Sequence, residues 1–499
     1  MASQQHGTVT YQTVGDDYFE KRKLRRYAGV FSLWALGVGA VISGHFSGWN
    51  FGLGFGWGSM FVATVVITIM YLGLTYSIAE MSPALPHTGG AYSFARSAMG
   101  PWGGFITGVA ENIEYVLTPA VVVFFIGSYL GAILETGPEL QPVYWVGGYA
   151  LFLALNLFGV ELSFRVTVVV TLLALACLAV FYVSAIPSID FSKFAMNIGV
   201  GPDGALVDLP DGGGPFLPDG LHGVLAALPF AVWLYLAIEQ LPLAAEETRD
   251  PKRDMPRGIM LAMFTLIASA FLVLTLNASI APGSAGLKAS GEPLLDGFRT
   301  LFGGDIAKLL ALVAIMGLIA SFHAIIYAFG RQIYSLSRAG YFPRGLSVTH
   351  GTHKTPYLAL IAGTVLGLGV MLIIWFVYGA ETGGAFIGAA LLNMAVFGAM
   401  ISYVMQGVSF ILLRTKLPHI ERPYRSPFGI LGAALTVAIA LVTIYFQVTD
   451  PAFRDPVIGV AIYYVVTILY FALFGRSRLV LSPEEEFAMS KGTADYKTH

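Results

Sequence analysis

Runs of about 18 or more apolar residues recur along almost the whole chain, and they restrict its fold more than any other feature. Each run can cross about 30 Å of hydrocarbon as a helix. Because lipid offers no hydrogen-bond partner to backbone N–H and C=O groups, a helix satisfies them within the segment itself. Charged residues make up 12% of the 499 residues, whereas soluble domains carry about 25%. The sequence therefore predicts an all-α integral membrane protein.

The runs divide into about twelve expected membrane helices. These lie near residues 29–55, 58–82, 101–134, 143–162, 164–187, 221–244, 257–281, 306–335, 356–378, 384–413, 428–448 and 455–474. The N-terminal residues lack the apolar core of a cleaved signal peptide, so we expect the first span to be retained. The expected organisation is an N-terminal tail (1–28), a first five-helix repeat (29–187), an extracellular loop (188–220), a second five-helix repeat (221–413), two further helices (414–474) and a C-terminal tail (475–499).

Lys and Arg are distributed unequally between the two ends of these spans. If both termini face the cytoplasm, the cytoplasmic segments hold all but five of the 28 Lys and Arg residues. Cytoplasmic loops of membrane proteins carry such an excess. The pattern predicts a multi-pass protein of the plasma (inner) membrane with both termini in the cytoplasm. The five exceptions are Lys193, Lys288, Arg299, Lys308 and Arg454.

Charge and cysteine content argue against other classes of protein. The net charge is −2, and no basic stripe suggests nucleic-acid binding. Cys177 is the single cysteine, which excludes an internal disulfide framework or a multi-cysteine metal site. The sequence shows no nucleophile motif, phosphate-binding loop or metal cluster, so we expect no enzyme, no cofactor and no metal.

The first span contains an unusual concentration of glycine. The stretch from Gly37 to Asn50 reads GVGAVISGHFSGWN. Glycine costs about 1 kcal/mol relative to alanine inside a helix, and it lets the backbone leave helical geometry. A glycine-interrupted span indicates a transporter binding site, because unwound backbone is tolerated in a membrane where protein or a watered cavity surrounds it. The alternative is that the small residues let two helices pack closely.

The sixth span, within LPFAVWLYLAIEQLPLAAEETRDPKRDMP, contains a second interruption. Pro229 and Pro242 each remove a backbone donor, and Glu239 lies between them at membrane depth. An ionisable residue there costs roughly 2.5–3.5 kcal/mol and indicates function. The two interrupted spans are five spans apart, as expected for two inverted five-helix repeats whose breaks meet at a binding site. This relation favours the binding-site interpretation.

Two further acids lie in the third span, in the stretch GVAENIEYVLTP. Glu111 and Glu114 are three residues apart, so both face one side of a helix. Two buried carboxylates close together do not readily both ionise, and such a pair favours a proton or a cation nearby. The alternative is a structural pair that is hydrogen-bonded to neighbouring helices.

Aromatic and histidine side chains near the breaks are also candidates. Trp233, Tyr235 and Tyr115 offer aromatic faces to a cation, although most aromatic residues in such a chain face lipid or pack. His45 in the first break and His323 in the eighth span can hydrogen-bond a substrate or shuttle protons. Membrane histidines are about as often satisfied helix-packing groups.

The segments outside the spans carry two further expectations. Residues 188–220 and 282–305 form long loops rich in turn residues, which either fold over an entrance or act as solvated connectors. Glu80 stands at the cytoplasmic end of the second span. We expect it to pair with a basic loop residue.

Motifs over nearly the whole length resemble those of the amino acid–polyamine–organocation (APC) transporter superfamily. They are VGAVISGHFSG in the first span, AEMSPALPHTGGAYSFAR after the second, AAEETRDPKRDMPRGI after the sixth and SLSRAGYFP after the eighth. Within the superfamily, GHFSGWNFGL, PHTGGAYSFARSAMGPWGGF and AENIEYVLTPAVV are similar to the ethanolamine permease branch. The resemblance implies a leucine-transporter-like fold of two inverted five-helix repeats plus two C-terminal helices. It also implies a central site between the first, third, sixth and eighth helices.

The resemblance carries over to particular positions. Ser43, Gly44 and His45 correspond to the break that binds substrate in the family. Residues 233–239 correspond to the sixth-helix break, and Glu239 matches the family's coupling or gating acid. Alternating access is expected to proceed by rocking of the first, second, sixth and seventh helices against the rest.

The chain departs from the family pattern at two places. Glu111 falls where amino-acid transporters tend to place an uncharged residue that lines the site. Some proton-coupled relatives have a lysine midway along the fifth helix, whereas residues 165–180 here read RVTVVVTLLALACLAV. A lysine-based coupling mechanism is therefore not expected.

The acidic residues in the membrane spans indicate which charged group the substrate carries. An amino-acid site must satisfy a carboxylate, usually on N–H groups at the first break, whereas ethanolamine presents a lone ammonium. We expect an importer of ethanolamine or a similar small amino alcohol, with a neutral amino-acid transporter as the alternative and H+ or Na+ as possible coupling ions.

We expect Glu111 to bind the ammonium and Glu239 to move with the gate. The expected substrate-binding residues are Ser43, Gly44, His45, Glu111, Glu114, Tyr115, Trp233, Tyr235, Glu239 and His323, and Glu239 and Glu111 are the expected coupling or gating residues.

Overall fold

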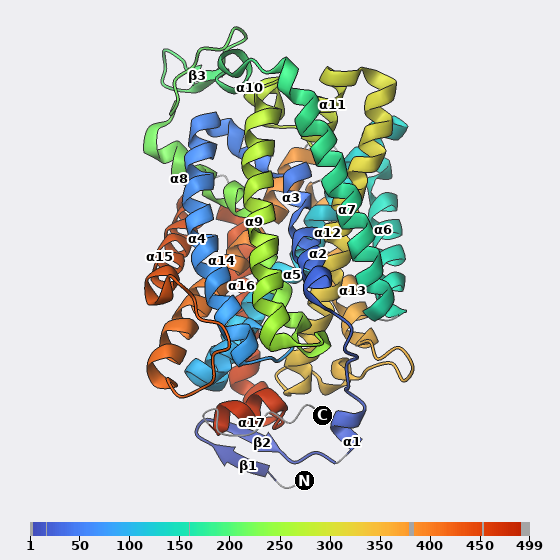
Figure 1. The fold of residues 1–499 in the computed structure, drawn as a ribbon, viewed down its shortest axis with the longest axis vertical. Helices are drawn as coiled ribbons and strands as arrows, with labels where there is room; N and C mark the ends of the chain where they lie inside the picture. Colours follow the sequence, from blue (N-terminus) through green and yellow to red (C-terminus); the bar gives the residue numbers. More distant parts are fainter. Residues whose placement is uncertain (1–2, 16, 159, 379–383, 452–453, 491–499) are drawn as a thin grey trace.

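The computed structural model is a bundle of long helices that run roughly along one axis (Figure 1). It describes residues 3–15, 17–158, 160–378, 384–451 and 454–490. Residues 491–499 of the expected C-terminal tail lie outside the described residues. The N-terminal strands and the last helix lie at the same end of the bundle, which we call the terminal end. The opposite end is the outer end.

Ten helices in the described ranges are long and apolar enough to cross a membrane. The two other expected spans are the interrupted first span and α6 (Gln141–Leu157), which has 17 residues. The expected all-α membrane architecture is therefore confirmed. The other long helices are α4 (Trp57–Ala84), α5 (Ala91–Leu134), α7 (Val160–Ala185), α9 (Pro251–Ala278), α12 (Gly304–Arg338), α13 (Tyr357–Tyr378), α14 (Gly384–Lys416), α15 (Gly429–Thr449) and α16 (Arg454–Leu473).

The first span is broken into three pieces. Helix α2 (Val30–Val41) ends near the middle of the bundle and is followed by α3 (Ser43–Phe46) and the 3-10 segment η1 (Trp49–Phe55). Gly48, between α3 and η1, has φ of 94°, in the region that favours glycine. The glycine-rich stretch therefore interrupts the helix.

The sixth span is broken between its two prolines. Pro229 lies inside α8 (Gly220–Trp233), and Pro242 lies inside the 3-10 segment η5 (Ile238–Glu247). At the junction, Ala237 adopts the left-handed conformation with φ of 80°. A non-glycine residue in this region costs roughly 1–2 kcal/mol, and such strain is common at functional sites.

Helix α5 changes direction at its terminal end. Gly100 has φ of 78° and ψ of −173°, which separates a short segment that begins at Ala91 from the long membrane helix that follows. The long helical segment after this kink starts at Pro101, the residue at which the sequence predicts the third span to begin. The short segment carries Tyr92 and Arg96 to the terminal end.

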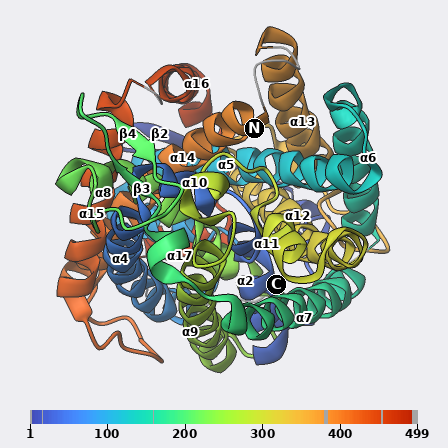
Figure 2. The same ribbon diagram turned by 90° about the horizontal axis from the view of Figure 1, so that it is seen from above.

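The spans differ in how deeply they are buried. Among the ten membrane-length helices, the interrupted sixth span and α5 are the most deeply buried, and α15 and α16 are the least buried. Viewed from above, α5 and α12 lie near the centre, and α6, α13 and α16 lie at the periphery (Figure 2). The centre of the bundle is therefore built from the two breaks, α5 and α12.

The two long loops fold into a cap at the outer end (Figure 1). Asn50 at the end of the first break donates hydrogen bonds to the carbonyl oxygens of Leu287 (2.7 Å) and Ser290 (2.9 Å). The loop 282–305 is therefore packed against the first span. The cap contains η3 (Ile186–Ser188), η4 (Phe191–Ala195), the antiparallel strands β3 (Ile198–Val200) and β4 (Leu206–Asp208), α10 (Gly283–Leu287) and α11 (Pro293–Phe302).

A second cap covers the terminal end. Glu485 is fully buried and accepts hydrogen bonds from Tyr11 (2.6 Å), Arg96 (2.5 Å), Tyr341 (2.9 Å) and Tyr92 (3.0 Å). The C-terminal segment is thereby attached to the helix ends. This cap contains the antiparallel strands β1 (Ser3–His6) and β2 (Val9–Gln12), α1 (Asp17–Glu20), η6 (Arg344–Ser347), η8 (Gly475–Ser477) and α17 (Pro483–Met489); the remaining short element, η2 (Pro138–Leu140), joins α5 to α6.

Candidate functional site

Three carboxylates meet in the interior where α5 faces the second break. Glu111 and Glu114 come from α5, and Glu239 comes from η5; each is at most 1% exposed. Glu239 lies close to both of the other acids, so the three groups form one cluster. Two side chains predicted to share a helical face thus meet the acid of the sixth-span break. We call these three residues the acid cluster.

Glu111 is held by two hydrogen-bond donors. Its Oε2 accepts a hydrogen bond from Gln332 Nε2 of α12 at 2.9 Å, and its Oε1 accepts one from the Tyr115 hydroxyl at 3.3 Å. Gln332 Nε2 also donates to the carbonyl oxygen of Gly108. Both oxygens of Glu111 are therefore already satisfied by the protein.

Glu114 and Glu239 lie within hydrogen-bonding reach of one another. Oε2 of Glu239 accepts a hydrogen bond from the Tyr403 hydroxyl at 2.7 Å, and the Tyr71 hydroxyl lies 3.0 Å from that of Tyr403. Neither oxygen of Glu114, nor Oε1 of Glu239, accepts a hydrogen bond from a donor in the described part of the chain. Two adjacent carboxylates repel unless they share a proton or a cation. This pair is the place in the cluster that can receive a positive group.

The two breaks touch one another beside the cluster. A Cβ on Gly44 would lie 2.3 Å from the carbonyl oxygen of Trp233, so only glycine permits this approach. His45 Nδ1 lies 2.8 Å from Ser269 Oγ and its Nε2 lies 3.0 Å from the carbonyl oxygen of Leu234. Both ring nitrogens of His45 therefore have protein partners, and the ring joins the two breaks.

Further hydrogen bonds tie the first break to its neighbours. The Trp233 indole donates to the carbonyl oxygen of Ser47 at 2.9 Å. Ser43 Oγ donates to Ser321 Oγ of α12 at 2.8 Å, and Ser321 donates to the carbonyl oxygen of Ala40. Carbonyl groups freed by the end of α2 are thus satisfied by side chains, as burial requires.

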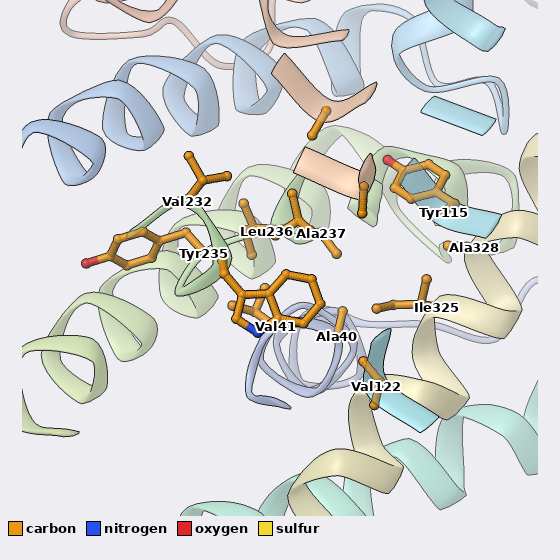
Figure 3. Close-up of a cluster of buried hydrophobic side chains, with 14 of the residues drawn as sticks. Ala40, Val41, Tyr115, Val122, Val232, Tyr235, Leu236, Ala237, Ile325 and Ala328 are labelled. Carbon is orange, nitrogen blue, oxygen red and sulfur yellow. The ribbon is translucent and has the colours of Figure 1, made fainter. Parts of the chain in front are cut away.

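Apolar side chains from four elements meet beside these polar groups (Figure 3). In this view Tyr235 and Tyr115 lie on opposite sides of Leu236 and Ala237. The centre of the bundle therefore contains a packed cluster of apolar side chains as well as the acids. The other labelled members are Ala40 and Val41 from α2, Val122 from α5, Val232 from α8, and Ile325 and Ala328 from α12.

His323 lies apart from the breaks, on the side of α12 that faces α6 and α7. Its Nδ1 lies 3.0 Å from Asn156 Nδ2, and its Nε2 lies 3.1 Å from Ser163 Oγ. Both partners belong to the helix pair α6 and α7, and within the described residues no acid of the cluster hydrogen-bonds to the ring. These contacts are those of a helix-packing group.

Buried ion pairs close the terminal side of the site. Arg331 of α12 pairs with Glu247 of η5 at 2.9 Å, and Arg338 pairs with Glu246 at 2.7 Å. Glu484 of α17 also pairs with Arg338, at 3.0 Å. These contacts join the broken sixth span to the continuous α12. Movement of η5 away from α12 would have to break them.

Glu80 makes the type of contact that the sequence predicts. Its carboxylate accepts hydrogen bonds from Arg414 at 2.6 and 3.0 Å and from the backbone N–H of Ser426 at 2.7 Å, and Arg422 lies at 3.2 Å. The cluster joins the end of α4 to α14 and the loop that follows α14. Its partners are basic residues at the terminal end, as expected.

Comparison with known proteins assigns the chain to a family. A family described as amino acid permease matches residues 29–474, which include both breaks and all three acids. The chain belongs to this amino acid permease family. The expected membership of the APC transporter superfamily is confirmed, and the protein is a permease with multiple membrane-spanning helices.

Relatives of the permease align over nearly the full length of both chains. An uncharacterized transporter of Rhizobium meliloti (strain 1021) is 27% identical over 461 residues, which cover 91% of this permease and 92% of the relative. The branched-chain amino acid permease BcaP of Bacillus subtilis (strain 168) is 24% identical over 488 residues, 93% and 96% of the two chains. The L-asparagine permease of Streptomyces coelicolor is 24% identical over 453 residues, 87% and 86%. The names of these relatives do not single out ethanolamine.

Sequence reasoning about the permease missed the donors that surround the acid cluster. Tyr71, Gln332 and Tyr403 lie on α4, α12 and α14, and each hydrogen-bonds to an acid or to a donor of one. Polar residues in membrane helices are a usable signal, and Gln332 in the stretch AFGRQIYSL carries it. The two tyrosines carry no such signal, because tyrosine is common in membrane helices.

Proposed function

We propose that the permease transports a small substrate that carries an ammonium group, and that ethanolamine or a similar amino alcohol fits the acid cluster best. The observation that supports this proposal is the pair Glu114 and Glu239. Three of its four carboxylate oxygens accept no hydrogen bond from a donor in the described residues. An ammonium group would supply up to three donors and a positive charge to that pair.

The negative charge of the acid cluster disfavours a carboxylate elsewhere on the substrate. No Lys or Arg in the described ranges forms an ion pair with Glu111, Glu114 or Glu239. A substrate carboxylate near these acids would be repelled in a site from which water is largely excluded. A hydroxyl group avoids that repulsion, and the apolar side chains beside the acids suit the two methylene groups of ethanolamine.

A neutral amino-acid transporter is the second candidate, and the comparisons favour it. The relatives whose substrates are named include a branched-chain amino acid permease and an L-asparagine permease. Backbone N–H groups at the break between α2 and α3 are suited to a carboxylate, because a helix start is partially positive. In this alternative the acids would bind the amino group while the break binds the carboxylate.

The same pair of acids provides a route to coupling. Glu114 and Glu239 hold one proton between them when no cation is present, and an ammonium would take the place of that proton. We therefore propose that the coupling ion is a proton rather than Na+. The site is reached alternately from the two ends of the bundle, and the terminal end faces the cytoplasm of a plasma membrane.

Competition in proteoliposomes tests the proposed substrate. Serine is ethanolamine with an added carboxylate, so the two compounds isolate the feature in question. We expect a 100-fold excess of unlabelled ethanolamine, but not of serine, to abolish uptake of labelled ethanolamine. The same vesicles, given a pH or a Na+ gradient, identify the coupling ion. Equal competition by serine would favour the amino-acid transporter instead.

A further inference from the structure

We propose that a basic groove at the terminal end of α4 and α9 binds the headgroup phosphate of an anionic phospholipid. The groove has a volume of about 590 Å³. It lies on the surface, away from the acid cluster and from the two breaks. We call it the basic groove; the lining residues that matter are Tyr76 of α4, Lys252, Arg253, Arg257 and Phe264 of α9, and Tyr424 of the loop after α14.

The charges of the groove are poorly balanced within the protein. Lys252 pairs with Glu421 at 2.7 Å. The guanidinium groups of Arg253 and Arg257 make no ion pair or hydrogen bond with any described residue. They are four residues apart on one helix, so they repel each other. They also lie in the first two turns of α9, where the positive end of the helix dipole favours anions rather than cations. A bound phosphate would relieve both repulsions.

Neighbouring basic residues are not available to bind an anion in the same way. Arg414 and Arg422 are already engaged by Glu80. The basic groove therefore differs from the rest of the basic terminal end, because two of its guanidinium groups remain available. Guanidinium groups bind phosphate oxygens through two parallel hydrogen bonds. The hydroxyls of Tyr76 and Tyr424 offer further donors at the rim.

The face of α9 that continues from the groove toward the membrane centre indicates that the anion is a lipid. Arg253, Arg257, Met260 and Phe264 follow one another at helical spacing, so they form one stripe along α9. Cations occupy the terminal end of this stripe and apolar side chains the part nearer the membrane centre. Phe264 is 52% exposed at a place where a membrane protein meets hydrocarbon. This order of charges and apolar groups matches a phospholipid headgroup followed by its acyl chains.

Binding of short-chain lipids to the purified full-length permease tests this proposal. The probes are dioctanoyl phosphatidylglycerol, dioctanoyl phosphatidylcholine and inorganic phosphate, each titrated in an uncharged detergent and read by native mass spectrometry and by thermal stability. We expect phosphatidylglycerol to bind and to raise the melting temperature, and the other two probes to do neither at the same concentration. The double variant Arg253→Gln, Arg257→Gln should bind phosphatidylglycerol roughly 10- to 30-fold more weakly.

The matched control is the double variant Lys416→Gln, Arg476→Gln, which removes the same charge from exposed positions at the same end. It should bind phosphatidylglycerol as the wild type does. Melting temperatures without lipid verify that both variants fold, and the exposed positions of all four residues make this the expected result. Unchanged binding by the Arg253, Arg257 variant would overturn the site. Displacement of phosphatidylglycerol by an equal concentration of inorganic phosphate would show a free-anion site and overturn the lipid assignment.

Discussion

At the scale of single residues, hydrogen-bond partners distinguish acids that look alike in the sequence. Glu111 accepts hydrogen bonds from Gln332 and Tyr115, whereas Glu114 accepts none from a donor in the described chain. Sequence position alone made Glu111 the expected ammonium-binding residue. The contacts shift that role in our proposal to Glu114, together with Glu239.

This assignment predicts unequal effects of two matched substitutions. Glu114→Gln preserves the shape of the side chain but removes a charge-assisted hydrogen bond worth about 1.5–3 kcal/mol, so ethanolamine affinity should fall roughly 10- to 100-fold. Glu111→Gln should weaken binding less, because that carboxylate is already engaged by protein donors. Calorimetric titration of both variants measures the difference. Normal binding by the Glu114 variant with lost binding by the Glu111 variant would reverse the roles.

At the scale of elements, the contact between the two breaks depends on the absence of a side chain at one position. A Cβ at Gly44 would lie 2.3 Å from a backbone oxygen of Trp233, and a backbone atom cannot rotate away. Gly44→Ala should therefore separate α3 from the end of α8, with a cost of about 1–3 kcal/mol and at least a tenfold loss of uptake.

The matched control for this substitution lies in η1. A Cβ at Gly54 would meet no atom within 4 Å, so Gly54→Ala should transport and melt as the wild type does. Initial uptake rates and melting temperatures of both variants test the prediction. Wild-type uptake by Gly44→Ala would mean that close contact of the breaks is dispensable.

At the scale of the whole molecule, the buried carboxylate of Glu485 fastens the C-terminal segment to the terminal end. Four donors from β2, α5 and the segment after α12 surround it. Loss of one partner of a buried ion pair costs about 3–5 kcal/mol. Glu485→Gln should therefore release α17 and make the segment after residue 478 sensitive to limited proteolysis. Glu486→Gln, at an exposed neighbouring position, should leave the segment protected; equal protection in both variants would contradict this role.

Orientation in the membrane is also a property of the whole molecule. Cysteines introduced as Asp250→Cys and Ala205→Cys into a Cys177→Ser background would occupy exposed positions at opposite ends. An impermeant thiol reagent applied to intact cells should label position 205 and not position 250. The reverse pattern would place the terminal end outside. The charge asymmetry of the loops is the physical reason for this expectation.

Several features of this permease follow from its sequence alone. Apolar runs determine the number and approximate ends of the spans, because the hydrophobic effect and backbone hydrogen bonding act within each segment. Glycines, prolines and a buried acid mark both breaks for the same local reason. The loops at 188–220 and 282–305 were ambiguous, because their packing depends on partners such as Asn50 in another segment.

The tertiary structure alone decided how the acids are used. Gln332 lies 221 residues from Glu111, and Tyr403 lies 164 residues from Glu239, yet each pair forms a hydrogen bond. Such pairing depends on how separate helices pack, and no local pattern encodes it. Packing also explains why His45 and His323, both expected from the sequence to bind substrate, have different surroundings. His45 joins the two breaks, whereas His323 links α12 to α6 and α7. Local chemistry determined where the helices break, and long-range packing determined which carboxylates accept hydrogen bonds from donors in the described part of the chain.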